Sequence, residues 1–127
     1  MRAADADILI VPGLRGSGPT HWQSRWESKL SSARRVVQTD WENPRRADWE
    51  ETLARAIAEC RRPAVIVAHS LGVATVLHVA HHAAETIAGA FLVAPPSEQA
   101  VRELPCIDAD FLPYPRSPLP FPAVTAA

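Results

Sequence analysis

Cysteine is scarce in this sequence, and neither sign of charge dominates it. The 127 residues include two cysteines, Cys60 and Cys106, without C-x-x-C spacing, which argues against a disulfide framework and a cysteine zinc site. The 13 Lys and Arg residues against 14 Asp and Glu leave a formal net charge of -1. Nucleic acid and anionic lipid are therefore not expected as partners.

A secretory signal is not expected, because the start of the sequence has neither a basic leading region nor a long enough apolar stretch. Charge is missing from residues 63–84, and these 22 residues could cross a bilayer. The stretch nevertheless carries polar side chains, among them His69, Thr75 and His82, which a lipid-facing helix would hold at high cost. We therefore expect a cytoplasmic protein with no membrane partner.

Short β-branched runs alternate with helical segments along the chain, the pattern of an α/β domain with a mainly parallel sheet. Strands are expected near residues 8–11, 35–39, 64–68, 89–94 and 123–126. An apolar helix is expected from 71 to about 84, and a proline-rich loop over 105–122. The prediction is one domain, 1–127, built as a three-layer sandwich.

Two further helices are predicted from local patterns. Residues 20–23 (THWQ) have the form of a capping box, S/T-x-x-E/Q, and a similar cap is expected at residues 48–51. Trp22, Trp26 and Trp49 lie on apolar helical stripes and are expected in the core.

The strand at 64–68 runs directly into the letters HSLG and then into a helix. This is the context of a nucleophile elbow, in which a sharp turn lifts a serine above the sheet. Ala68 and Gly72 meet the demand for small residues on both sides, with Ala in place of the usual Gly. Ser70 is the predicted nucleophile, and the backbone N–H of Leu71, at the helix start, is a predicted donor to an oxyanion.

A second oxyanion donor is expected from the glycine-rich segment 12–18 (PGLRGSG), whose backbone can approach a ligand closely. The N–H of Leu14 is the first choice and that of Arg15 the second. Arg15, His21 and Trp41 are candidates for the pocket. His21 comes just after this segment, and Trp41 lies at the carboxyl edge of the sheet, where ligands bind in such folds.

Four segments, VPGLRGSGPTHWQSRWE, QTDWENP, VIVAHSLG and GAFLVAPP, resemble in order and spacing the small serine hydrolases of the α/β-hydrolase superfamily typified by retinoblastoma-binding protein 9 and bacterial YdeN. The resemblance extends from Ile8 to Ala127. It implies a carboxylesterase-like Ser-His-Asp hydrolase that acts on a small-molecule ester or amide and uses no cofactor. Carried over by position, Ser70 is the nucleophile, and the backbones of Leu71 and Leu14 form the oxyanion hole.

The sequence departs from this family after the nucleophile. In α/β-hydrolases the acid and then the histidine of the triad come after the serine, but no histidine occurs after His82. The segment PLPFPAVTAA reaches the strand that precedes the acid, so we expect an α/β-hydrolase fold that is incomplete at its C-terminal end. The general base and acid stay open. Two functions also stay open: a serine hydrolase, or a non-catalytic, vestigial hydrolase acting as a binding module.

The other titratable candidates are interpreted as structural. His69 is expected to point away from the serine on a tight turn. His78 and His82 have the i, i+4 spacing of helical zinc sites but lack the neighbouring glutamate and a third ligand, so no metal is expected. Asp108 and Asp110 are expected to be solvated in the proline-rich loop.

Overall fold

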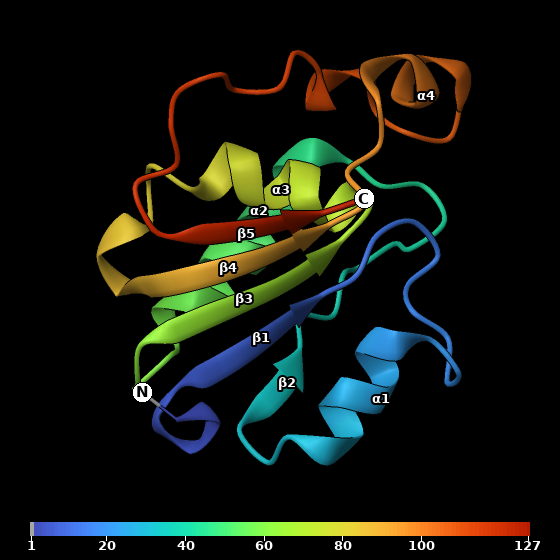
Figure 1. Ribbon diagram of the computed structural model, residues 1–127. Helices are drawn as coiled ribbons and strands as arrows, with labels where there is room; N and C mark the ends of the chain where they lie inside the picture. Colours follow the sequence, from blue (N-terminus) through green and yellow to red (C-terminus); the bar gives the residue numbers. More distant parts are fainter. Residues whose placement is uncertain (1) are drawn as a thin grey trace.

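The computed structural model describes residues 2–127, which form a five-stranded parallel sheet of order β2-β1-β3-β4-β5 (Figure 1). The strands are β1 (Asp7–Val11), β2 (Ala33–Arg35), β3 (Ala64–His69), β4 (Ile87–Val93) and β5 (Ala123–Ala126). The helices are α1 (Trp22–Lys29), α2 (Arg46–Ala58), α3 (Leu71–Val79) and α4 (Glu98–Glu103). Short 3-10 turns occur at Ala3–Asp5, Ala84–Thr86 and Ala109–Phe111. The parallel sheet with its helices confirms the predicted α/β fold class.

Helices lie on both faces of the sheet, which makes three layers (Figure 1). On one face, side chains of α2 and α3 pack against the sheet, with Leu53 of α2 and Ile66 of β3 in the same buried cluster. On the other face, Trp22 of α1 packs against the buried cluster that contains Ile10. The central strands are therefore buried from two sides, as their continuous apolar runs indicate.

The second strand is shorter and begins earlier than predicted. The run at 35–39 predicts a strand there, whereas β2 covers Ala33–Arg35. Val36 still donates its N–H to the Ile10 carbonyl at 2.9 Å, but Val37 is 64% exposed and lies outside the sheet. Because β2 is an edge strand, its pairing with β1 decides its extent, and the strand propensity of the two valines does not.

Both predicted helix caps are wrong. The N-cap of α1 is His21, whose Nδ1 accepts the Gln23 N–H at 3.1 Å. The Gln23 side chain is fully buried and points into the sheet. Helix α2 begins at Arg46, before the predicted cap, and the Arg46 N–H donates to Asp108 Oδ2 at 3.1 Å. Long-range partners therefore decide what these polar side chains do.

Helix α1 buries less of its aromatic face than predicted. Trp49 is fully buried as expected, but Trp22 is partly buried and Trp26 is 39% exposed. Trp26 stacks on Phe91 of β4, with ring centroids 5.8 Å apart and 9° between the planes. The pair lines an open apolar groove of about 540 Å³ that extends to Val124 of β5. Helix α1 lies beside β2 in Figure 1, so it covers only part of this face.

The uncharged stretch 63–84 is divided between β3, α3 and a turn. Helix α3, expected to reach about residue 84, ends at Val79. Within residues 2–127, no helix is long and apolar enough to cross a membrane.

Candidate active site

Ser70 is the one residue between β3 and α3, and its backbone is strained. Its φ is 55° and its ψ is -124°, values that residues with a Cβ rarely adopt. The Ser70 N–H donates to the Val93 carbonyl of β4 at 3.0 Å, and the Ser70 carbonyl accepts the Val73 N–H at 2.9 Å. Main-chain bonds on both sides therefore hold Ser70 at the carboxyl edge of the sheet.

The small residues around Ser70 are required by close backbone packing. Ala68, at the end of β3, is fully buried. A Cβ on Gly72 would overlap the Val11 carbonyl oxygen and lie 2.8 Å from the Pro12 carbonyl oxygen. A side chain at position 72 would therefore push α3 away from β1 and open the turn.

The glycine-rich segment 12–18 passes directly beside Ser70. A Cβ on Gly13 would lie 2.9 Å from the Ser70 Cβ and 2.9 Å from the Leu71 nitrogen. The chain then turns, with Arg15 at φ 67°, Gly16 at φ 70° and a 3.0 Å hydrogen bond from the Gly16 N–H to the Gly13 carbonyl. The absence of a side chain on Gly13 is what allows this approach.

The backbone N–H groups of Leu14 and Leu71, the two predicted oxyanion donors, have no acceptor within residues 2–127. Leu71 is the first residue of α3, where a helix leaves its N–H groups without intrahelical partners. The Arg15 N–H, the second choice for an oxyanion donor, is already bonded to the Trp41 carbonyl at 2.8 Å. Of the two candidate donors on this loop, the Leu14 N–H is therefore the one without an acceptor.

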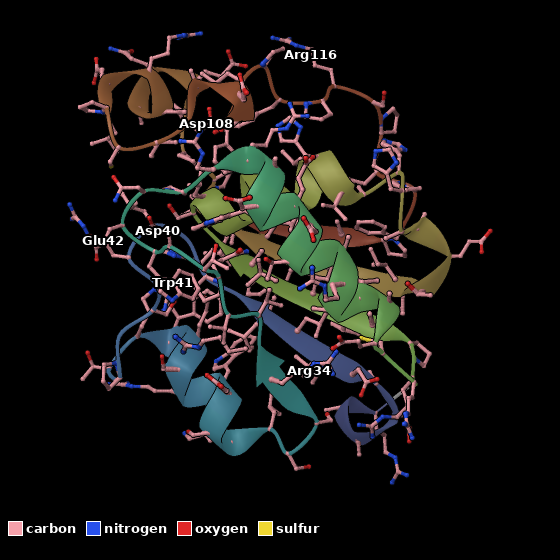
Figure 2. The ribbon with its side chains drawn as sticks, turned by 180° about the vertical axis from the view of Figure 1, so that it is seen from behind. Arg34, Asp40, Trp41, Glu42, Asp108 and Arg116 are labelled. Carbon is pink, nitrogen blue, oxygen red and sulfur yellow. The ribbon has the colours of Figure 1, made fainter. Side chains whose placement is uncertain are left out.

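Trp41 lies beside the loop, on the segment between β2 and α2 (Figure 2). Its indole packs over Gly16, where a Cβ would lie 3.4 Å from the ring. It also meets Trp49 edge to face, with ring centroids 5.8 Å apart. The Arg15 side chain points to the surface and pairs with Glu42 at 3.5 Å, both side chains being mostly exposed. Trp41 thus packs against the loop. Arg15 is bonded to this part of the fold through its backbone N–H, because its side chain points to the surface.

His21 and His69 meet on the α1 side of the turn, with ring centroids 4.7 Å apart. Burial lowers the pKa of His69, and the neighbouring His21 adds to this effect. Burial and the charge of Arg35 lower the pKa of His21. Both imidazoles therefore favour the neutral form. No hydrogen bond joins either ring to the Ser70 hydroxyl in the described part of the chain.

The remaining titratable candidates bind other parts of the fold. His78 Nε2 lies 2.7 Å from the Phe111 carbonyl oxygen and connects α3 to the proline-rich loop. The sequence indicated that Asp108 is solvated. In the structure its carboxylate instead accepts hydrogen bonds from the N–H groups of Arg46 and Asp110. Among residues 2–127, no group of three His, Cys, Asp or Glu side chains is placed to bind a metal ion.

Two buried polar residues, one in α1 and one in the loop, are not predicted by the sequence patterns. Gln23 is fully buried, and Ser17 is 7% exposed. Local patterns assign Gln23 to a helix cap. No local signal distinguishes a capping glutamine from one that bonds to strands far away in the sequence.

Comparison with known families identifies the chain. A family model described as serine hydrolase matches residues 8–127. This chain belongs to the serine hydrolase family. The match confirms the resemblance seen in the sequence, and it includes every element that shapes the Ser70 turn.

Two solved structures are similar to this chain. A protein described as a YdeN-like hydrolase from Pectobacterium atrosepticum has a TM-score of 0.80 and 32% identity, over 98% of this chain and 64% of its own. The YdeN protein of B. subtilis has a TM-score of 0.57 and 26% identity, over 68% of this chain and 50% of its own. The chain thus spans less than two thirds of the first of these proteins and half of the second. No curated protein matches its sequence.

Proposed function

We propose that this chain carries the nucleophile and oxyanion hole of a hydrolase that acts on small-molecule esters or amides. One observation carries the proposal: the strained Ser70 turn and the glycine loop meet so closely that a Cβ on Gly13 would lie 2.9 Å from the Ser70 Cβ. Leu14 and Leu71, whose N–H groups have no acceptor within residues 2–127, follow Gly13 and Ser70 directly, which supports a role for both groups at the same serine. A strained backbone beside preorganised donors is typical of sites that stabilise a tetrahedral intermediate.

In the proposed reaction the Ser70 Oγ attacks the acyl carbonyl carbon and forms a C–O bond, while its proton passes to an imidazole. The carbonyl oxygen becomes an oxyanion and accepts hydrogen bonds from Leu14 and Leu71. Collapse of this intermediate breaks the bond to the alcohol or amine, which leaves with the proton. Water then attacks the acyl-serine, releases the carboxylic acid and restores Ser70.

Within residues 2–127, no histidine ring is hydrogen-bonded to the Ser70 hydroxyl to accept this proton. His21 Nδ1 accepts from the Gln23 N–H, and His78 Nε2 is bonded to the Phe111 carbonyl. The test of the proposal therefore measures the reactivity of Ser70 itself, which does not require full turnover of a substrate.

A fluorophosphonate probe tests the site, because its phosphonyl oxygen would occupy the proposed oxyanion hole while the Ser70 Oγ bonds to phosphorus and fluoride leaves. We expect labelling of the purified chain at Ser70, located by peptide mass spectrometry, and none in Ser70→Ala. Ser28→Ala is the matched control, because Ser28 is an exposed serine whose hydroxyl bonds only to the Arg25 carbonyl. A wild-type chain that takes up no probe, or unchanged labelling in Ser70→Ala, would overturn the proposal.

A binding module is the second candidate function. It is favoured by the lack of a hydrogen-bonded imidazole at the Ser70 hydroxyl within residues 2–127. A site that keeps its oxyanion hole but lacks the triad retains only about 10³- to 10⁴-fold acceleration over water. Measurable ester hydrolysis that disappears in Ser70→Ala would exclude this candidate.

A further inference from the structure

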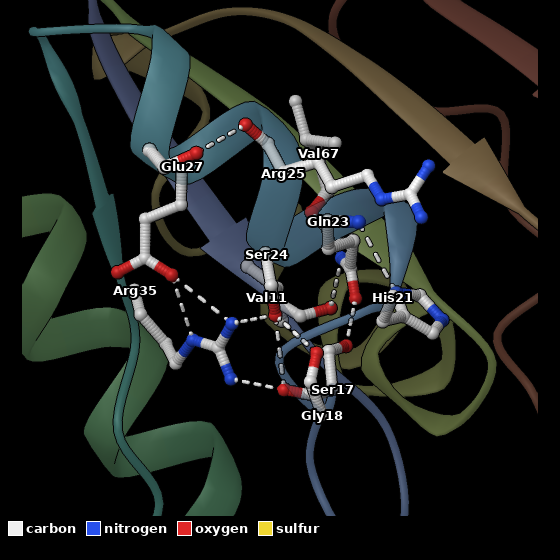
Figure 3. A network of polar contacts seen from close by, with 11 residues as sticks. Val11, Ser17, Gly18, His21, Gln23, Ser24, Arg25, Glu27, Arg35 and Val67 are labelled. Atoms are coloured by element: carbon white, nitrogen blue, oxygen red, sulfur yellow. Dashed lines mark hydrogen bonds and ion pairs between the residues drawn. The ribbon is translucent and has the colours of Figure 1, made fainter.

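A single buried amide connects the glycine loop to β1 and to β3, the strand that leads into the Ser70 turn (Figure 3). Gln23 Nε2 donates to the Val11 carbonyl at 3.2 Å and to the Val67 carbonyl at 2.9 Å. Its Oε1 accepts a hydrogen bond from the Ser17 hydroxyl. All the polar atoms of this fully buried side chain are therefore used.

The three partners of the Gln23 amide lie at the boundaries of the glycine loop and close to Ser70. Val11 ends β1 and leads into the loop, Ser17 lies near the end of that loop, and Val67 lies three residues before Ser70. The Gln23 amide thus holds both ends of the loop at a set distance from the strand that carries the serine.

The far end of the loop is held by a second group of contacts. The Ser17 carbonyl accepts hydrogen bonds from Arg35 at 2.8 Å and from the Ser24 hydroxyl at 3.1 Å. Arg35 is itself held by Glu27, with an N–O distance of 3.0 Å (Figure 3). Ser17 is therefore tied to α1 through Ser24 and to β2 through Arg35, and these bonds hold the partner of the Gln23 amide in place.

We propose that Gln23 is a positioning residue, which sets the loop of residues 13–16 against the Ser70 turn so that the Leu14 and Leu71 N–H groups serve one oxyanion. This inference rests on the proposed function. Its physical basis is that both donors are backbone groups, so their relative placement depends on how the loop and the Ser70 turn are held against each other. A buried amide with three partners constrains that placement more tightly than apolar packing, which tolerates sliding.

The test substitutes Gln23→Met, which keeps the volume of the side chain but removes all three hydrogen bonds. Ser17→Ala removes only the hydrogen bond between the Ser17 hydroxyl and the amide. It is measured in place of Gln23→Met if that variant does not fold. Ile57→Ala is the control, because Ile57 is a fully buried residue of α2 in the cluster on the opposite face of the sheet. It destabilises the core without touching the loop.

Two measurements are made on each variant. The first is fluorophosphonate labelling of Ser70, resolved into the probe's affinity and its maximal rate. We expect Gln23→Met to lower the maximal rate about tenfold to a hundredfold with little change in affinity, since small misplacements near a reacting centre cost this much. Ile57→Ala should label at the wild-type rate while it stays folded.

The second measurement is amide hydrogen exchange at Arg15 and Gly16, whose N–H groups are bonded to Trp41 and Gly13. Exchange is expressed relative to the amides of β3 in the same variant. We expect about tenfold faster relative exchange at both amides in Gln23→Met and no change in Ile57→Ala.

The outcomes separate this inference from the proposed function. Absence of labelling in the wild type overturns the proposed function, and the exchange data alone then decide whether Gln23 holds the loop. Labelling of Gln23→Met at the rate of Ile57→Ala, or equal relative exchange in the two variants, overturns the positioning role of Gln23 even where Ser70 is reactive.

Discussion

Gly72 and Val11 meet backbone to backbone, so that a Cβ on Gly72 would overlap the Val11 carbonyl oxygen. This contact places the first turn of α3 against the end of β1, where the glycine loop begins. The same carbonyl accepts a hydrogen bond from the buried Gln23 amide. Val11 therefore connects the helix after Ser70 to the loop that carries Leu14.

The first prediction concerns Gly72→Ala. The added methyl group must displace backbone atoms of Val11 and Pro12, so we expect a loss of about 1–3 kcal/mol in the free energy of unfolding. Urea denaturation measures the loss. Gly18→Ala is the control, since a Cβ at Gly18 would meet nothing within 4 Å. An equal change in the two variants would contradict the packing argument.

The second prediction concerns the strain at Ser70. Glycine adopts a φ of 55° without the steric cost that a Cβ imposes. We therefore expect Ser70→Gly to be more stable than Ser70→Ala by about 1–3 kcal/mol, although both lack the hydroxyl. Thermal or urea unfolding of the two variants compares them directly. Equal stability would show that the Ser70 turn stores no strain.

The third prediction concerns pH and the pair His21 and His69. Burial lowers the pKa of both imidazoles below the ordinary value of 6.5, so the unfolded chain binds protons more readily than the folded one. The stability that this pair contributes is fully present above about pH 6.5. It decreases as the pH falls through the lowered pKa values of the folded state.

Urea unfolding at pH 7.5 and pH 5.5 measures this effect. Between pH 7.5 and pH 5.5, the free energy of unfolding should fall less in the double variant His21→Asn, His69→Gln than in the wild type. Neither replacement titrates, and Asn can still cap α1. His82→Gln, at an exposed histidine, is the control and should keep the wild-type drop. If the free energy of unfolding falls as much in the double variant as in the wild type, the pH dependence does not come from His21 and His69.

The fourth prediction concerns Asp108, which accepts the Arg46 N–H at the start of α2 and the Asp110 N–H in its own loop. Burial acts to raise the pKa of Asp108, but these hydrogen bonds and the nearby arginines outweigh it and lower the pKa. We expect Asp108→Ala to cost about 1 kcal/mol, the usual cost of losing a helix cap.

The same variant should also release the proline-rich loop, so that limited proteolysis cuts residues 105–122 faster. Asp110→Ala is the matched control, since its carboxylate makes no hydrogen bond within residues 2–127. Cleavage at equal rates in the two variants would show that Asp108 does not hold the loop.

Much of the candidate site is determined by short-range chemistry that can be read from the letters alone. The order of strands and helices is visible in the alternation of β-branched runs and helical stripes. Ser70 is recognisable because its turn requires Ala68 and Gly72, and that requirement is a local matter of steric fit. The loop at Gly13 is recognisable because a backbone that passes close to another chain segment needs glycine.

The tertiary structure alone decided which backbone donors are free and which side chains are buried. The Arg15 N–H is taken by the Trp41 carbonyl, which leaves the Leu14 N–H available. Gln23, a helix cap by its local pattern, is instead a buried link between two strands and the loop. Trp26 lies on an apolar stripe but stays 39% exposed. Sequence patterns specify what each residue can do, whereas hydrogen-bond partners and burial depend on which distant segments the fold brings together.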